Sequence, residues 1–323
     1  MRPERTAATG LGLALLSAAT FGTSGIFARS LIDAGWSADA AVAARIGIAA
    51  LALAVPALVA AKGRWDVVKR TAGTIGLFGL LAVAGAQVAF FNAVRYLPVG
   101  VALLIEYSGI VLVVLWMWAA HGQRPRRLTV AGAVTALLGL VLVLDLTGTG
   151  RIDPVGVLWG LGAAVGLAAY FVLSARIDPE LPSTTLAAGG MAVGAVVLLA
   201  LGAAGALPMR ATFGTVEFGG TRMSWVVPVV GLSLVAAVVS YVAGIGAARI
   251  LGAALSSFVG LTEVMFAVLF AWIVLSELPS VVQGAGGALI VAGIVLVRVD
   301  ALRADKPQPN ASTPRTLSRA SLS

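Results

Sequence analysis

Long apolar stretches recur along the whole chain, each close to the ~20 residues that a helix needs to cross the ~30 Å hydrocarbon layer of a bilayer. Their apolar residues run continuously instead of alternating with polar ones, which excludes the strands of a membrane β-barrel. The pattern predicts an all-α integral membrane protein with ten transmembrane helices, at 8–28, 40–61, 72–92, 98–119, 128–146, 155–175, 185–206, 225–247, 252–275 and 281–299.

The composition agrees with this class. Hydrophobic residues make up 59% of the chain and charged residues 11%, with a mean hydropathy of +1.01, whereas about a quarter of a soluble domain is charged. The first stretch continues through TFGTSGIFA and is longer than the apolar core of a signal peptide, so we expect it to be retained. Residues 300–323 are rich in Ser, Pro and Arg, and we expect a disordered cytoplasmic tail there.

The basic residues are distributed unevenly between the connecting segments. Most of the 22 Lys and Arg residues fall on the side of the membrane that holds the N-terminus. This bias predicts that both termini are cytoplasmic and that the protein is a multi-pass protein of the inner (cytoplasmic) membrane. The net charge of +8 therefore reports orientation, and we expect lipid as a partner and no nucleic acid.

The two halves of the chain match each other without a gap at one offset. Arg95 corresponds to Arg249, and 249 − 95 = 154. The same offset pairs Trp118 with Trp272, Gly132 with Gly286, and Gly139 with Gly293. The sequence predicts one five-helix repeat in residues 1–150 and a second in 151–299, with the four glycines allowing close helix packing.

An odd number of helices per repeat determines how the copies are oriented. The second copy must enter the membrane from the opposite side, which gives an inverted-topology repeat. Secondary transporters have this architecture, with the substrate site near the midplane between the halves and alternating access by exchange of two similar arrangements. Transport is thus the function that the repeat favours.

Three stretches carry a resemblance to a known family: AARIGIAALAL (43–53), RYLPVGVALLIEYSGIVLVVL (95–115) and RILGAALSSFVGLTEVMFAVLFAWIVLSELP (249–279). They resemble the drug/metabolite transporter superfamily and within it the EamA-type transporters. The second stretch is also similar, more weakly, to amino-acid exporters of the threonine/homoserine type. The resemblance implies a ten-helix exporter whose ninth helix ends in a glutamate, Glu277. The first half departs from that pattern with Gln123.

Two acids lie near the middle of predicted spans, Glu106 in the fourth and Glu263 in the ninth. At the repeat offset, Glu106 matches Gly260 and Gly109 matches Glu263, so each helix carries an acid and a glycine on one face, in swapped order. The functional interpretation is that one or both bind a cationic substrate group or a coupling proton. The alternative is a structural ion pair with Arg45, the basic residue inside a span.

Arg45 itself allows two interpretations. It could reach the membrane interface with its long side chain, or it could bind a substrate carboxylate. Hydroxyl and aromatic side chains near the acids suit a small amphipathic solute, although such hydroxyls commonly bond to backbone or bridge helices. The candidates of this kind are Tyr107, Ser257, Thr262, Tyr170 and Tyr241. Arg95, Arg249 and Glu277 lie at span ends and are expected to be structural or gating residues.

Other chemistry finds little support in the sequence. The chain has no cysteine and one histidine, His121 in a connecting loop, and no nucleotide-binding motif. We therefore expect no metal site, no cofactor and no enzyme activity. The expected function is a secondary transporter that exports amino acids or related small metabolites. Proton coupling, an uncoupled facilitator, a channel or sensor, a membrane-embedded enzyme using the two glutamates, and a homodimer remain open alternatives.

Overall fold

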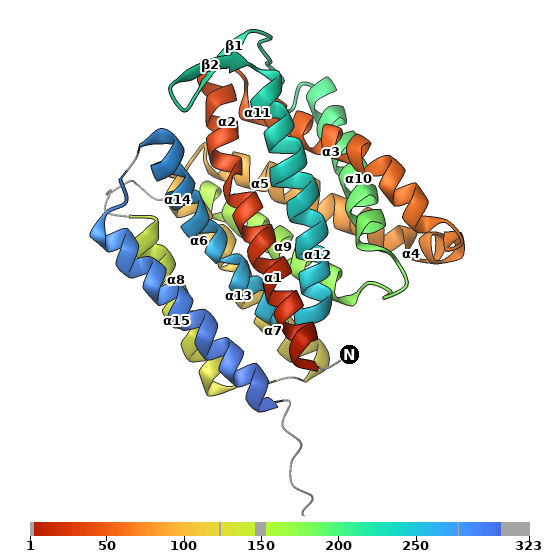
Figure 1. Ribbon diagram of the computed structural model, residues 1–323, viewed down its shortest axis with the longest axis vertical. Helices are drawn as coiled ribbons and strands as arrows, with labels where there is room; N and C mark the ends of the chain where they lie inside the picture. Colours follow the sequence, from red (N-terminus) through yellow and green to blue (C-terminus); the bar gives the residue numbers. More distant parts are fainter. Residues whose placement is uncertain (1–2, 123, 146–152, 277, 305–323) are drawn as a thin grey trace, which may run out of the picture.

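The computed structural model describes residues 3–122, 124–145, 153–276 and 278–304, and nearly all of them are helical. Within these residues, nine helices are long and apolar enough to cross a membrane. The fifth predicted span, 128–146, appears as a shorter apolar helix at Arg127–Val143, so the described residues do not establish the predicted count of ten. Figure 1 shows the bundle and the position of each element.

The first half contains five helical rods, three of which are interrupted. Ser37 starts the second rod, because its side chain accepts a hydrogen bond from the amide of Ala40 at 3.3 Å. The elements are α1 (Pro3–Gly22), α2 (Ser24–Asp33), α3 (Ala38–Ala61), α4 (Trp65–Phe78), the π-helix η1 (Gly79–Gly85), α5 (Ala86–Ala93), α6 (Val99–Tyr107), α7 (Gly109–His121) and α8 (Arg127–Val143).

The second half repeats this order with an added hairpin. Asp153 caps its first helix by accepting a hydrogen bond from the amide of Val155 at 2.8 Å, with Pro154 in the first turn. The elements are α9 (Pro154–Arg176), α10 (Ser183–Ala203), β1 (Thr215–Phe218), β2 (Thr221–Ser224), α11 (Val226–Val230), the π-helix η2 (Gly231–Val239), α12 (Ser240–Leu251), α13 (Ala253–Gly260), α14 (Thr262–Leu275) and α15 (Val281–Ala304). The last helix continues past the predicted tail boundary at 300, and residues 305–323 lie outside the described part.

Irregular backbone features recur at the offset found in the sequence. Gly122 and Ser276, 154 residues apart, both end a helix in the left-handed conformation, with φ of 64° and 58°. The π-helices η1 and η2 end at Gly85 and Val239, again 154 residues apart. A left-handed serine is uncommon, so its match with Gly122 is a structural signature of the repeat.

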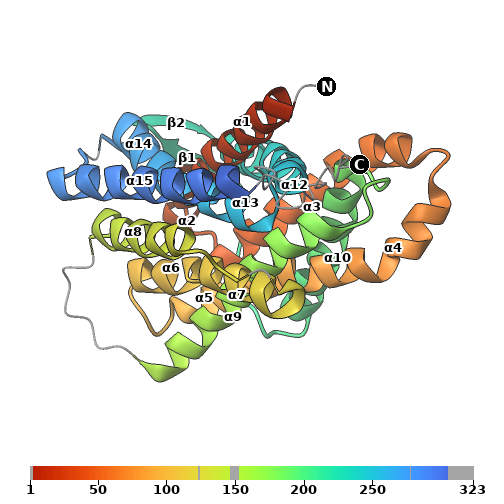
Figure 2. The same cartoon turned by 90° about the horizontal axis from the view of Figure 1, so that it is seen from below.

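Helix packing follows the same repetition. α1 packs along α12 as α9 packs along α5, and α3 packs on η2 as α10 packs on η1. α8 and α15 lie side by side at one edge of the bundle (Figures 1 and 2). The predicted close approach there is confirmed. A Cβ on Gly139 would lie 2.5 Å from the carbonyl oxygen of Gly286, and one on Gly132 would lie 2.7 Å from that of Gly293.

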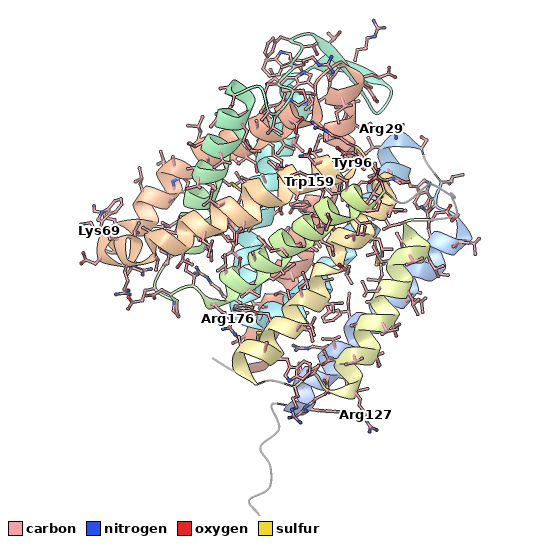
Figure 3. The ribbon with its side chains drawn as sticks, turned by 180° about the vertical axis from the view of Figure 1, so that it is seen from behind. Arg29, Lys69, Tyr96, Arg127, Trp159 and Arg176 are labelled. Atoms are coloured by element: carbon pink, nitrogen blue, oxygen red, sulfur yellow. The ribbon has the colours of Figure 1, made fainter. Side chains whose placement is uncertain are left out.

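The bundle has two opposite faces that differ in character. The hairpin face carries the β1–β2 hairpin, the connection 34–37 and Arg29; the basic face carries Lys69, Arg127 and Arg176 (Figure 3). The described chain begins and ends near the basic face (Figure 1).

The hairpin is attached to the first half by several contacts. The Trp36 indole N–H donates to the carbonyl oxygen of Thr212 at 2.7 Å, and the Thr212 hydroxyl donates to that of Ala34 at 2.6 Å. Phe27 stacks on Phe218 with ring centroids 5.3 Å apart. The segment 204–225 thus closes over the connection between α2 and α3.

Candidate functional site

A cavity of about 370 Å³ lies between the two halves. Its walls come from α1, α2, α3, α5, α6 and η1 of the first half and from α9, η2, α12, α13 and α14 of the second. Near the hairpin face it reaches Ile32, which is 44% exposed. Toward the basic face it ends at Ala14, Ala247 and Ser256, all of which are buried. The cavity is therefore closed toward the basic face.

Both candidate acids line this cavity. Glu106 occupies the last turn of α6, just before the interruption at Ser108, and Glu263 occupies the first turn of α14, just after the interruption at Leu261. Each carboxylate is partly accessible and close enough to the other for an electrostatic interaction. One acid comes from each half, so the duplication brings two carboxylates to one cavity.

The glycines at the matching positions differ from each other. Gly260 lines the cavity, and a Cβ there would meet the Phe171 ring at 3.0 Å. Gly109 does not line it, because its Cα packs against the backbone of Ala164 on α9. The predicted common face of acid and glycine therefore opens onto the cavity in α13–α14 only, while in α6–α7 the glycine serves helix packing.

Arg45 points into the same cavity from α3 and is only 4% exposed. Its Nη2 donates to the carbonyl oxygen of Ala236 in η2 at 2.6 Å, and its guanidinium carbon lies 4.5 Å from the centroid of the Phe21 ring. Its Nε is buried and has no hydrogen-bond partner. The side chain does not reach the membrane interface, so that interpretation of Arg45 is wrong.

The structural alternative for the acids was an ion pair with Arg45. Glu263 and Arg45 are close enough to interact electrostatically. Nevertheless, among the ion pairs found in the described residues, none joins Arg45 to Glu106 or to Glu263. The cavity therefore holds one cation and two carboxylates that are not paired with it.

Three predicted tyrosines surround these charges. Tyr107, Tyr170 and Tyr241 all line the cavity. The Tyr107 hydroxyl interacts with the Glu263 carboxylate, and the rings of Tyr170 and Tyr241 meet edge to face with centroids 5.4 Å apart. The Tyr170 hydroxyl lies directly over the Cα of Gly244, so a side chain at that glycine would displace it.

Ser257 and Thr262 do not line the cavity, contrary to the prediction. Each hydroxyl donates to a carbonyl oxygen three residues earlier, that of Ala254 or Val259, at 2.7 Å. Ser256 lines the cavity instead. One residue along a helix turns a side chain by about 100°, and only the packing of α13 fixes which serine faces inward.

The apolar part of the lining was not predicted. Six of its members are Phe21, Phe90, Phe91, Leu103, Leu167 and Leu232. The chain is so hydrophobic that the sequence does not distinguish apolar residues that line a cavity from those that pack in the core or face lipid. The repeat register could have indicated Phe90, because 244 − 90 = 154 pairs it with the lining residue Gly244.

Arg95 and Arg249, two of the three predicted gating residues, lie at the two faces, outside the cavity lining. At the hairpin face, Arg95 forms a 4.0 Å ion pair with Asp39. At the basic face, Nη1 of Arg249 donates to the carbonyl oxygen of Leu181 at 2.6 Å, while its Nε and Nη2 are buried without partners. Glu277 lies outside the described residues, as does Gln123. Within the part of the chain that is described, no three His, Cys, Asp or Glu side chains gather in a way that could hold a metal ion.

Beside Arg249, the loop between α9 and α10 carries a surface ion pair. Arg70 donates to Asp178 and approaches Glu180 at 3.5 Å. The hydrogen bond from Arg70 holds the pKa of Asp178 below its usual range. This cluster connects α4 to the loop at the basic face.

Known transporters are similar in sequence to parts of this chain. The threonine/homoserine exporter RhtA of Salmonella typhimurium strain LT2 is 28% identical over 128 residues, 39% of this chain and 41% of that protein. The uncharacterized transporter YwfM of Bacillus subtilis strain 168 is 28% identical over 135 residues, 42% of this chain and 46% of that protein. The chain thus spans less than half the length of the curated relatives that it matches.

The fold is also found among solved protein structures, and one of them illustrates the likeness. It superposes with a TM-score of 0.72 at 21% identity, covering 93% of this chain and 99% of the other. At that identity the likeness shows the fold alone.

The EamA-like transporter family matches the chain twice, at residues 8–145 and 154–299. The two matches coincide with the two halves of the bundle and together span most of its length. The resemblance seen in the sequence is therefore confirmed, and the chain is a multi-pass membrane protein that belongs to the EamA-like transporter family.

Proposed function

We propose that the protein is a secondary transporter that exports amino acids or related small metabolites by alternating access. The cavity between the halves is its translocation site, and Glu106 and Glu263 bind a cationic substrate group or a coupling proton. The observation that carries the proposal is the placement of one carboxylate from each half in a single cavity.

The proposed membrane arrangement has ten crossings in two inverted repeats, with both termini in the cytoplasm. The 17 residues of α8 rise roughly 26 Å at ~1.5 Å per residue, close to the ~30 Å hydrocarbon layer. Lys69, Arg127 and Arg176 on one face support a cytoplasmic assignment of that face. The cavity then faces away from the cytoplasm and is closed on the cytoplasmic side.

Two observations support amino acids as the solute class. Free amino acids carry an ammonium and a carboxylate, and the cavity offers carboxylates and a guanidinium for them. A relative, RhtA, is a threonine/homoserine exporter by name. An uncoupled facilitator would use the same cavity without a role for a proton at the glutamates.

The test is flux in proteoliposomes for threonine, homoserine, leucine and lysine, with and without an imposed pH gradient. We expect saturable, gradient-driven flux, and a loss of roughly tenfold or more in Glu106→Gln or Glu263→Gln, because glutamine is similar in size but can neither carry a negative charge nor bind and release a proton. Glu217→Gln is the matched control, because Glu217 is exposed on β1 and outside the cavity.

Three outcomes separate the alternatives. Loss of driven flux in one glutamine variant, with the control unchanged, supports coupled transport and identifies the coupling acid. Saturable flux that ignores both the gradient and the two substitutions indicates a facilitator with structural glutamates. Absence of flux for every amino acid in the panel contradicts the proposed solute class.

A further inference from the structure

Arg45 lines the cavity, and its hydrogen bonding leaves part of its guanidinium without a partner. A guanidinium carries five N–H groups and suits two-point binding of a carboxylate. Here Nη2 bonds to the carbonyl oxygen of Ala236, whereas Nε has no partner although the side chain is almost fully buried. A buried cation with an unsatisfied N–H is costly, so the site is incomplete as it stands.

The position of the guanidinium is fixed in advance. The Phe21 ring lies under its central carbon at 4.5 Å, and the carbonyl oxygen of Ala236 anchors one end. A donor group that is already held in place loses little conformational freedom when a ligand binds. Arg45 is therefore prepared to receive an acceptor from inside the cavity.

The remaining charges specify the other end of the ligand. Glu106 and Glu263 line the same cavity and form no ion pair with Arg45. A ligand with an ammonium and a carboxylate would satisfy both groups and would bring no net charge into the membrane. An amine or an organic acid of the same size would leave one side unpaired.

Building on the proposed function, we infer that the cavity selects zwitterionic α-amino acids with an apolar side chain, and that Arg45 is the residue that binds their carboxylate. The ammonium group faces Glu106 and Glu263. The side chain of the amino acid lies among Phe90, Phe91 and Leu103, in a cavity whose lining is predominantly apolar.

The same bond connects ligand binding to the protein backbone. Ala236 belongs to η2, so the guanidinium that receives the carboxylate also holds the π-helix of the second half. A ligand that attracts the Arg45 guanidinium strains its hydrogen bond to Ala236. Binding of the carboxylate is thereby coupled to η2, a connection that an amine without a carboxylate lacks.

The experiment compares leucine with two analogues that each lack one charge, isoamylamine and 4-methylpentanoate, by direct binding to the purified full-length protein. We expect each analogue to bind roughly 100-fold more weakly than leucine, or weaker still, because a buried polar group of the site is then left unpaired. Arg45→Lys should weaken leucine and 4-methylpentanoate and leave isoamylamine within about twofold, because a point charge does not reproduce two-point binding. Glu263→Gln should weaken the binding of isoamylamine and leave that of 4-methylpentanoate within about twofold.

Controls keep the result interpretable. Arg222→Lys on the exposed strand β2 is the matched control and should change nothing. If Arg45→Lys does not fold, Phe21→Leu removes the ring beneath the guanidinium and should show the same selective loss in weaker form.

Each remaining outcome has one meaning. If leucine is transported and Arg45→Lys weakens leucine and isoamylamine equally, the assignment of Arg45 is overturned while the proposed function stands. Transport of threonine without binding of leucine overturns the apolar side-chain preference. A wild-type protein that moves no amino acid in the flux assay refutes the proposed function and this inference together.

Discussion

The two π-helices occupy equivalent places in the two halves, but the protein holds them in different ways. η1 is held by close packing on α10: a Cβ on Gly79 would lie 2.7 Å from the carbonyl oxygen of Gly190, and one on Gly194 would lie 2.6 Å from Val83. η2 packs on α3, where Arg45 donates to the carbonyl oxygen of Ala236. A solute in the cavity does not contact the packing between η1 and α10. It can contact Arg45, and so it can change the hydrogen bond that Arg45 makes to η2. In the proposed cycle, η1 would therefore stay fixed while η2 would respond to a bound solute.

The largest expected effect tests the packing of η1. Gly79→Ala should lower the free energy of unfolding by about 1–3 kcal/mol, because the added methyl meets backbone and a Val193 side chain that cannot move away. Gly231→Ala in η2 should destabilise less, because its methyl meets only the far edge of the Phe27 ring. Thermal unfolding in detergent measures both.

Gly73→Ala on α4 is the control for the general effect of alanine in a helix. No atom lies within 4 Å of its added Cβ, so we expect a gain of about 0.5–1 kcal/mol. Equal losses at Gly79 and Gly231 would show that the two π-helices are held alike, and the contrast between the halves would be abandoned.

A smaller effect concerns the arginines at the ends of the third rods. Arg249→Met removes the bond to the carbonyl oxygen of Leu181 at the basic face, whereas Arg95→Met removes a long ion pair to Asp39 and an exposed hydrogen bond to Asn92 at the other face. Because the chain has no cysteine, a single reporter, Ala247→Cys, can be labelled cleanly at the closed end of the cavity.

We expect Arg249→Met to speed labelling from the basic face roughly two- to tenfold, the equivalent of one hydrogen bond. Arg95→Met should leave the rate unchanged, because that residue lies at the other face. Labelling that is as slow in Arg249→Met as in the parent would mean that Arg249 does not help to close the basic face.

The smallest effect is a pH dependence at the basic face. The hydrogen bond from Arg70 lowers the pKa of Asp178 in the folded protein, so its stabilisation is complete above the unfolded pKa of about 3.9 and is lost as the pH falls through the lower folded value. The effect is small because the pair is exposed to solvent.

The measurement is the difference in unfolding temperature between wild type and Asp178→Asn as a function of pH. We expect a small, constant difference above about pH 4 that disappears in stronger acid. The hydrogen bonds that attach the hairpin involve an indole, hydroxyls and carbonyls, so Trp36→Phe should show no such pH dependence. A pH-independent difference for Asp178→Asn would rule out the ion pair as its source.

Much of the fold was predictable because its signals are local or repeated. Hydropathy located the helices, since lipid demands long apolar segments, and the ungapped offset of 154 located the two halves. Glu106 and Glu263 were recognisable because a carboxylate inside an apolar run needs a special environment. Those inferences need only the order of residues along the chain and no knowledge of tertiary contacts.

Other features depend on packing between segments that are far apart in sequence. Neither π-helix has a sequence signature, and the β1–β2 hairpin lies between two predicted spans, where the sequence predicted no element. The choice of Ser256 over Ser257 depends on the rotation of α13, and the aromatic lining is indistinguishable from core. The sequence did not decide between the two interpretations of Arg45, because its hydrogen-bond partner Ala236 lies 191 residues away along the chain.

The hairpin segment 204–225 has no counterpart in the first half, where Lys62–Arg64 makes the equivalent connection. Two perfectly equivalent halves would give a carrier with two end states of equal energy. Here the bonds from Trp36 and Thr212, each with a net contribution of about 0.5–1.5 kcal/mol, tie down one face only. In the proposed cycle this makes the empty carrier rest on one side of the membrane, so that loading from one compartment is intrinsically favoured before any gradient is applied.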